Sequence, residues 1–320
     1  MGITRFPHGI SSFGVPLPVL SGVPGMPFTT GKYIFVCNAS GAGGSDNNDG
    51  LSPTSPLATV DAAFSLATAN KGDLVIVMPG HAETVTATSI AHDIAGVQVI
   101  GLGIGSLRPT FTFSTAAATI TITGANGAWR NCRFVANFVD VVTAFTVSVA
   151  KGVEITDNEF IDTSSILNFL VCVTTSTTNN DVDGLKFSRN VVESLPATDG
   201  ACVSILCNVK GLEINDNNVT KDATSDAGHL ATFAAKVITN LRLLRNTLTM
   251  KALSSQSTGT LITGSSTTSS GIVADNYVYQ IDTSTGLLAT TGQKFGYIQN
   301  FMSGAADASG SVFPAADNPA

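Results

Sequence analysis

Hydrophobic and polar residues follow one another along this chain in a frame that recurs many times. The frame reads apolar, any, apolar, any, any, Asn, any, apolar, and it fits Val153, Ile155, Asn158 and Phe160. We call the sixth position of the frame, the one that Asn158 occupies, the asparagine slot. Over the copies of the frame the residues at this slot are, in chain order, Cys132, Asn158, Asn190, Asn217, Asn246, Asn276 and Asn300. Neighbouring slots lie 24 to 32 residues apart. Repeats of this length are typical of stacked, solenoid-like architectures.

Short segments of alternating apolar residues lie between the copies and predict a second set of strands, over residues 118–123, 144–150, 169–174, 201–206, 230–235 and 260–263. Each repeat therefore has two or three strands, joined by Gly, Asn and Ser corners and too short for helices. Strand-rich repeats of this length stack one coil above the next. We predict an all-β fold, a single-stranded parallel β-helix (β-solenoid) of about nine coils over residues 74–302.

The asparagine slot is expected to point inward at a corner of each coil. The two apolar positions before it are two residues apart and face the same way, whereas the slot comes three residues later, so the chain must turn. A buried amide without partners costs about 1–3 kcal/mol, which favours a stacked ladder in which each side chain bonds the coils above and below. An ordinary turn-forming role is the alternative. It leaves the fixed apolar frame unexplained.

The residue before each slot alternates in charge, in the order Asp157, Arg189, Asp216, Arg245, Asp275 and Gln299. Coils about 4.8 Å apart would bring these side chains together along one outer edge. We interpret them as an exposed ladder of ion pairs, each worth about 0.2–1 kcal/mol.

The chain is predicted to divide into four segments: an extended apolar arm (1–30), a first strand, turn and capping helix (31–73), the β-helix (74–302) and a C-terminal tail (303–320). Val60, Ala63 and Phe64 have helical spacing behind Thr59, a good N-cap, so a helix over 59–69 is expected to cover the first coil. The arm has five Pro and five Gly but many large apolar residues. It lies either on its own solenoid or on a neighbouring surface.

Composition narrows the function classes. Of 320 residues 43% are apolar and 12% charged, with a net charge of -7. Too few Lys and Arg are present to hold a phosphate backbone, so no nucleic acid partner is expected. No apolar run approaches the roughly 20 residues of a membrane span, so no membrane-spanning helix is expected. No secretory signal is expected either. Five cysteines without a CxxC pair and only four histidines predict free buried thiols, no metal site and no cofactor.

Carboxylate pairs are the candidate catalytic groups, because an inverting polysaccharide hydrolase needs two carboxylates roughly 6.5–9.5 Å apart. The pairs are Asp157 with Glu159, Asp181 with Asp183, and Glu213 with Asp216. They are interpreted as charge-ladder, outward-strand or loop residues, and no nucleophile elbow accompanies them. We predict no catalytic residues. A surface-binding threonine array is also disfavoured, because the outward row Thr119, Thr121 and Thr123 is not expected to repeat in register on other coils.

Residues 49–83 resemble the beginning of pectin-lyase-like right-handed β-helices, in the run Asp49-Gly50-Leu51-Ser52-Pro53, the Ala-rich helix and Pro79-Gly80-His81-Ala82-Glu83. Three further stretches resemble a family of tailed-phage virion proteins: Thr4-Arg5-Phe6-Pro7-His8-Gly9, residues 101–110 and Gly228-His229-Leu230. The resemblance covers essentially the whole chain. It implies a right-handed β-helix in a capsid- or tail-associated structural protein that is commonly trimeric.

These observations predict a non-enzymatic virion protein, most simply a capsid decoration or cement protein. Its arm would dock on the major capsid protein through Ile3, Arg5, Phe6, Pro7, Ile10 and Phe13. We expect a homotrimer on the virion capsid surface, made in the host cytoplasm, with no membrane partner. The alternative is a tail fibre or tailspike that binds or depolymerises host surface polysaccharide.

Overall fold

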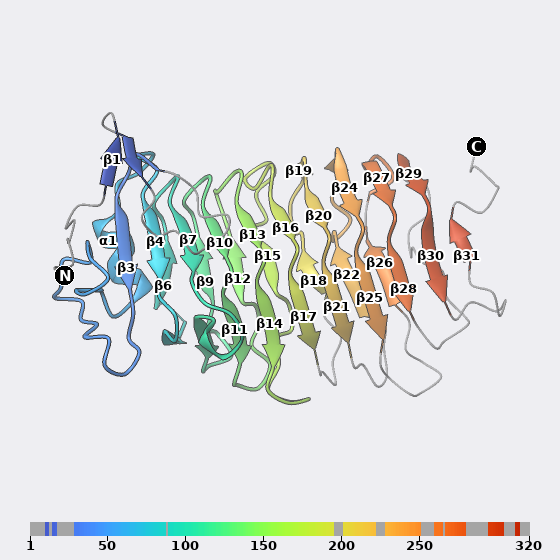
Figure 1. Cartoon of the computed structure of the whole chain (residues 1–320). Helices are drawn as coiled ribbons and strands as arrows, with labels where there is room; N and C mark the ends of the chain where they lie inside the picture. The colour runs from blue at the N-terminus through green and yellow to red at the C-terminus, as the bar shows by residue number, and fades with distance from the viewer. Residues whose placement is uncertain are drawn as a thin grey trace.

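Three parallel β-sheets run side by side along the molecule in the computed structural model (Figure 1). The structure describes residues 10–12, 15–17, 29–87, 89–194, 201–221, 228–250, 259–264, 266–279, 294–303 and 311–313. The chain passes from one sheet to the next and returns to the first sheet one coil further on. The predicted all-β fold, a right-handed parallel β-helix, is confirmed.

Sheet 1 consists of β3 (Tyr33–Val36), β4 (Leu74–Val77), β7 (Gln98–Gly101), β10 (Ala128–Arg130), β13 (Glu154–Thr156), β16 (Lys186–Ser188), β20 (Glu213–Asn215), β24 (Leu241–Leu244), β27 (Ser270–Ala274) and β29 (Lys294–Ile298). Sheet 2 consists of β5 (Ala82–Val85), β8 (Thr110–Phe113), β11 (Arg133–Ala136), β14 (Glu159–Asp162), β17 (Val191–Ser194), β21 (Asn218–Lys221), β25 (Thr247–Met250), β28 (Tyr277–Tyr279), β30 (Asn300–Ser303) and β31 (Ser311–Phe313), which pairs antiparallel.

Sheet 3 has seven strands, β6 (Ile90–His92), β9 (Ile120–Ile122), β12 (Phe145–Val147), β15 (Val173–Thr175), β18 (Ala201–Ser204), β22 (Gly228–Thr232) and β26 (Gly259–Thr263). Smaller elements are the antiparallel pair β1 (Ile10–Ser12) and β2 (Val15–Leu17), the parallel pair β19 (Val209–Lys210) and β23 (Ile238–Thr239), and the 3-10 turn η1 (Gly105–Leu107). Seven coils thus contribute a strand to all three sheets.

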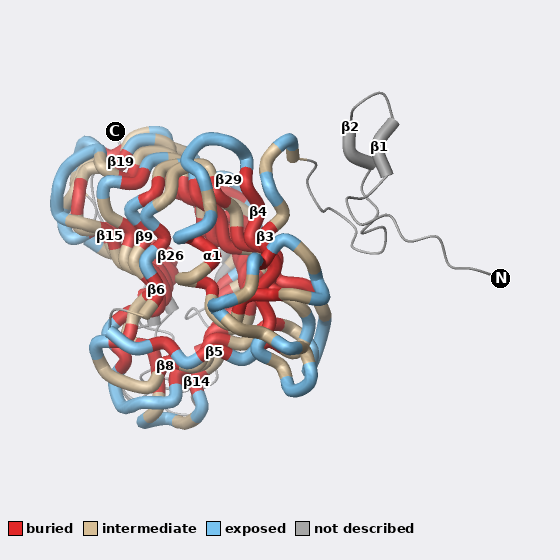
Figure 2. Tube along the Cα trace, turned by 90° about the vertical axis from the view of Figure 1, so that its left-hand side faces the viewer, coloured by how far each residue is buried: buried red, intermediate tan, exposed pale blue. Residues whose placement is uncertain are grey.

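Inward side chains from the three sheets fill the tube. Figure 2 shows in red the buried residues along the trace of the three sheets. Phe111, Phe134 and Phe160 occupy one inward position on successive strands of sheet 2, with ring centroids 5.6 and 5.1 Å apart. Trp129 and Phe145 contact Phe134 from the other two sheets. Because alternate residues of each strand face this core, the period-two pattern of the sequence is expected.

The corner between sheets 1 and 2 has the same backbone conformation on successive coils. A left-handed residue with φ between 48° and 61° ends each turn, at Asn131, Asp157, Arg189, Asp216, Arg245, Asp275 and Gln299. Asn and Asp tolerate this region better than other residues. The left-handed residue turns the next side chain, the asparagine slot, toward the interior.

Helix α1 (Val60–Leu66) covers the first coil, as in the sequence-based expectation. The Thr59 side chain accepts a hydrogen bond from the N–H of Ala62, and the helix buries Val60, Ala63 and Phe64. The Phe64 ring stacks on His92 of β6 with ring centroids 4.5 Å apart. The helix therefore joins the core aromatic cluster.

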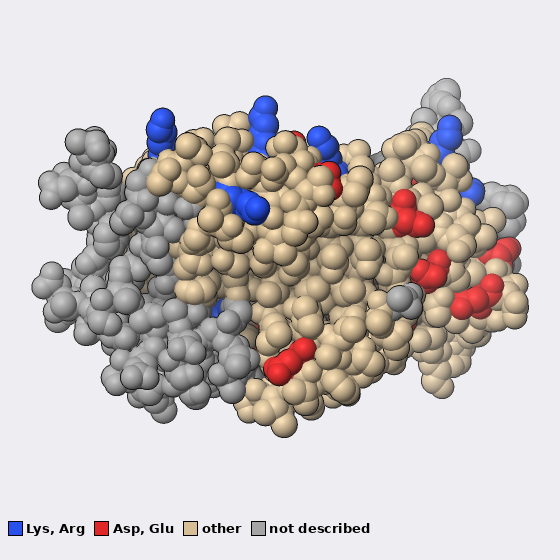
Figure 3. Space-filling model, turned by 180° about the vertical axis from the view of Figure 1, so that it is seen from behind, with Lys and Arg blue, Asp and Glu red and all other residues tan. Residues whose placement is uncertain are grey.

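The outward row Thr119, Thr121 and Thr123 does not repeat as a whole, but its central position does, contrary to expectation. One outward position of sheet 3 carries a hydroxyl on six successive strands, at Thr121, Thr146, Thr174, Ser204, Thr232 and Thr263. The loops that separate these residues differ in length, so the column appears only once the strands are aligned. Seen from behind, where sheet 3 lies, much of the described surface has no charged side chain (Figure 3).

Candidate functional site

The asparagine slots form a continuous hydrogen-bonded column inside the corner. Each asparagine Nδ2 donates to a main-chain oxygen of the preceding coil at 2.8–2.9 Å, and the partners are Trp129, Ile155, Phe187, Ile214, Leu243 and Val273. Each Oδ1 accepts from the N–H of the slot residue one coil before, at 2.9–3.2 Å. The polar groups are satisfied within the column, so it holds coils together and offers no free group to a ligand.

Cys132 occupies the first position of this column. Its N–H donates to Oδ1 of Asn158, and its Sγ contacts the main-chain oxygen of Arg130 at 3.5 Å. Burial raises the pKa of the Cys132 thiol to about 12. A thiol with so high a pKa is a poor nucleophile at neutral pH.

The corner charges pair across neighbouring coils. Arg189 Nε donates to Asp157 Oδ1 at 2.7 Å, and Arg245 Nε donates to Asp216 Oδ1 at 2.6 Å. Both pairs are exposed. Asp157 and Asp216, which belong to two different carboxylate pairs considered for hydrolysis, are therefore each held by a guanidinium group.

Glu159, on the outer face of sheet 2, is likewise held by two arginines. Arg133 contacts it at 2.7 Å and Arg108 at 3.0 Å. Asp183 lies 3.6 Å from Lys151, and Asp181 accepts a hydrogen bond from Ser176. Of the carboxylates in the three sequence-derived pairs, Asp157, Glu159, Asp183 and Asp216 thus lie in ion pairs with basic side chains.

A second charged column lies on the outer face of sheet 1. Glu154 receives hydrogen bonds from Arg130 at 2.6 Å and from Lys186 at 2.8 Å. Burial alone would raise the pKa of Glu154, but the two hydrogen bonds outweigh it and lower the pKa. The hydrogen bond to Glu154 raises the pKa of Lys186, so this lysine is unsuited to act as a general base.

The outer face of sheet 2 changes character toward its C-terminal strands. Tyr277 and Tyr279 of β28 both point outward and are 39% and 44% exposed. The Tyr277 ring stacks on Phe301 of β30, with centroids 5.2 Å apart and planes within 3°. On the preceding strand Thr247 and Thr249 are in register with the two tyrosines. We call these five side chains the aromatic face; β25, β28 and β30 can be followed in Figure 1.

The aromatic face was not found from sequence, because its members are separated by long connections and only strand register brings them together. Of the residues predicted to dock on a partner, the structure describes one. Ile10 begins β1, and Ile3, Arg5, Phe6, Pro7 and Phe13 lie outside the described residues.

Within the described ranges, no group of three or more His, Cys, Asp and Glu side chains is arranged to hold a metal ion. In that same part of the chain no helix is long and apolar enough to span a membrane.

No family model matches the chain. No curated protein matches it either. A solved structure described as a rhamnogalacturonan lyase is similar to it, with a TM-score of 0.50 and 13% sequence identity over 86% of this chain and 74% of the lyase. At this identity the likeness shows the fold alone, a pectin-lyase-like β-helix.

This likeness contradicts the prediction that the chain is not an enzyme. That prediction rested on missing sequence motifs, whereas a lyase is built on the same fold with almost unrelated residues. The fold is one that polysaccharide-acting proteins share.

Proposed function

We propose that this protein binds an extended polysaccharide across the aromatic face of sheet 2. The observation that carries the proposal is the pair of exposed tyrosines on β28, in register with two threonines on β25 and with Phe301 on β30. A sugar ring has an apolar C–H face that stacks on an aromatic ring, while its hydroxyls bond neighbouring polar groups. Tyrosine serves both needs, since its ring is apolar and its tip polar.

The geometry of the sheet suits a polymer. Successive strands repeat about every 4.8 Å, and the outward residues of β21, Asn218 and Thr220, continue the polar rows of Thr247 and Thr249. The net charge of -7 disfavours a strongly anionic chain. We therefore expect a neutral or weakly charged glycan.

Affinity electrophoresis of the full chain in gels containing neutral or acidic polysaccharides tests the proposal. A bound glycan retards the protein, and Tyr277→Ala and Tyr279→Ala should each weaken binding roughly tenfold, or about 1.4 kcal/mol. Phe138→Ala is the matched control, because Phe138 is equally exposed, at 42%, but lies away from this face. Equal loss in all three variants, or no retardation in any gel, would contradict the proposal. New reducing ends in the same incubations would reveal depolymerisation.

A virion location is a second proposal, and it is supported by the resemblance of residues 4–9 and 101–110 to tailed-phage virion proteins. Here the protein is a trimer, and the arm docks on the major capsid protein through Ile3, Arg5, Phe6, Pro7, Ile10 and Phe13. Deleting residues 1–30 should abolish particle attachment while the circular dichroism of the β-helix is retained. Virion copy number near that of the major capsid protein indicates head decoration, whereas a few copies per particle indicate a tail position.

A further inference from the structure

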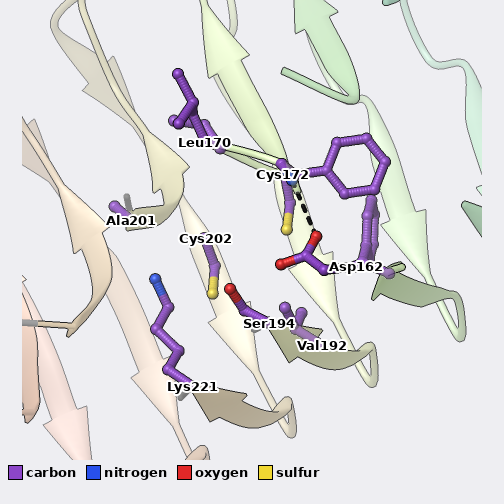
Figure 4. A pocket seen from close by; sticks show the side chains of 11 residues that line it. Asp162, Leu170, Cys172, Val192, Ser194, Ala201, Cys202 and Lys221 are labelled. Carbon is purple, nitrogen blue, oxygen red and sulfur yellow. Dashed lines mark hydrogen bonds between the residues drawn. The ribbon is translucent and has the colours of Figure 1, made fainter. Parts of the chain in front are cut away.

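A small polar pocket interrupts the apolar interior where sheet 2 ends and sheet 3 begins (Figure 4). Asp162 of β14, Ser194 of β17 and Lys221 of β21 line its sheet 2 side, and Cys172 and Cys202 line its sheet 3 side. All five side chains are buried. Figure 4 shows the two sulfur atoms facing the Lys221 amine and the Asp162 carboxylate across the pocket.

The fold does not demand polar residues here. The same inward position is Ala136 one coil before Asp162, and it is Met250 one coil after Lys221. Burying a carboxylate and an ammonium is costly unless both are well compensated. The cluster therefore places compensated polar side chains where the neighbouring coils carry apolar ones; the Asp162 carboxylate, for example, accepts from the Phe169 N–H at 2.9 Å.

The two cysteines occupy equivalent positions on adjacent coils. They directly precede Val173 and Val203, which are register partners, and the Cys172 N–H donates to the Cys202 main-chain oxygen at 3.1 Å. Adjacent parallel strands lie about 4.8 Å apart, within the Cα separation of about 4.4–6.8 Å that a disulfide spans. Both thiols are free and they hydrogen-bond each other.

The thiols differ in acidity. The hydrogen bond from Cys172 lowers the pKa of Cys202 and outweighs its burial, and the charge of Lys221 lowers it further. The same hydrogen bond, with burial, raises the pKa of Cys172 well above its ordinary value, and the charge of Asp162 acts to raise the pKa of both thiols. Lys221 acts on both thiols in the direction that favours the thiolate. We take Cys202 as the attacking thiol and Cys172 as the resolving one.

We propose that this pocket is a thiol oxidation site, in which a small hydroperoxide converts Cys172 and Cys202 into a disulfide between adjacent coils. The pocket has room for about one water-sized molecule, about 10 Å³, which excludes a sugar ring.

The reaction balances with peroxide as the oxidant. The Cys202 thiolate attacks one peroxide oxygen, so an S–O bond forms as the O–O bond breaks, and the leaving hydroxide takes a proton to become water. Cys172 sulfur then attacks the sulfenic sulfur, so the S–S bond forms as the S–O bond breaks. The released hydroxide takes the Cys172 proton. Two thiols lose two electrons in total, and one peroxide becomes two waters.

The test is peptide mapping of the full chain after exposure to hydrogen peroxide, with remaining thiols alkylated. We expect a cross-linked peptide pair containing Cys172 and Cys202 to form first, while Cys132 stays reduced. Cys202→Ser should abolish the cross-link, and Cys172→Ser should leave a Cys202 sulfenic acid that dimedone traps. Below the thiol pKa each added pKa unit cuts the thiolate fraction tenfold, so Lys221→Met should slow the reaction roughly tenfold.

The wild-type map alone suffices if a variant fails to fold. Equal reaction rates at Cys132, Cys172 and Cys202 would mean that oxidation proceeds through unfolding and would overturn the proposal. So would a cross-link between any other pair, or a rate that Lys221→Met leaves unchanged in a folded variant.

Discussion

The side-chain amide of Asn217 donates to Oδ1 of Asn246 on the next coil at 2.9 Å. The same amide donates to the main-chain oxygen of Phe187 on the coil before, also at 2.9 Å. One buried side chain thus connects three coils, and each neighbour in the column repeats the arrangement. The stability of the β-helix should be most sensitive to change at these positions.

We expect Asn217→Ala to lower the free energy of unfolding by about 3 kcal/mol, because it leaves the Asn190 N–H buried without its partner and removes the side-chain bonds to the Phe187 oxygen and to Asn246. Urea denaturation measures the effect. Asn218→Ala, on the exposed neighbour, should cost less than about 0.5 kcal/mol. The ladder would lose its assigned role if the two substitutions cost the same.

Stability should fall in mild acid because of His92. Its Nδ1 accepts from Trp129 Nε1 at 3.1 Å, and its buried Nε2 has no hydrogen-bond partner. Burial lowers the pKa of His92 from 6.5 to about 4. Between these values the unfolded chain binds more protons than the folded one, so the stabilisation present above pH 6.5 is lost as pH falls toward 4.

The pKa difference at His92 corresponds to about 3 kcal/mol. Urea titrations at pH 7 and pH 4 measure the loss, and His92→Gln, which keeps an acceptor for Trp129, should reduce it by that amount. An unchanged acid response in this variant would assign the sensitivity to other groups.

The exposed ion pairs should contribute little. A double-mutant cycle on Asp157 and Arg189 is expected to give a coupling below about 1 kcal/mol that shrinks with added salt. Glu154→Gln should destabilise more than Asp157→Asn, because Glu154 is less exposed and bonds two cations. A larger loss of thermal stability in Asp157→Asn than in Glu154→Gln would show that the ion pairs at the corner, and not those on sheet 1, contribute more to stability.

The cap depends on Glu83. Its Oε2 accepts from the Val60 N–H at 3.1 Å and lies 3.0 Å from His81 Nε2. Glu83→Ala leaves two buried polar groups without this partner and should cost about 2–3 kcal/mol, whereas Thr59→Ala should cost about 1 kcal/mol. Hydrogen exchange should show faster opening of α1 in both variants. Protection equal to that of the wild type would contradict the capping roles.

The sequence predicts those features that a few consecutive residues encode. The spacing of Val153, Ile155 and Asn158 lies within six consecutive residues, so the inward corner can be predicted without knowing the length of any loop. The sheet 3 hydroxyl column and the aromatic face depend on register between coils, and connections of unequal length hide it. The pocket is an intermediate case. Its residues Asp162, Ser194 and Lys221 each follow an asparagine slot by four residues, so their alignment on successive coils is contained in the sequence repeat. The non-enzyme prediction failed because missing motifs say little about a fold that tolerates divergent sequences.

The column of asparagines also makes the molecule modular. Every hydrogen bond in the column joins only adjacent coils, so the bonds that a coil makes do not depend on how many coils separate it from either end. Duplicating residues 218–246 should insert one further coil that finds a matching neighbour on each side, lengthening the rod by about 4.8 Å. The length of this protein is therefore a quantity that can change by whole steps while its cross-section stays the same.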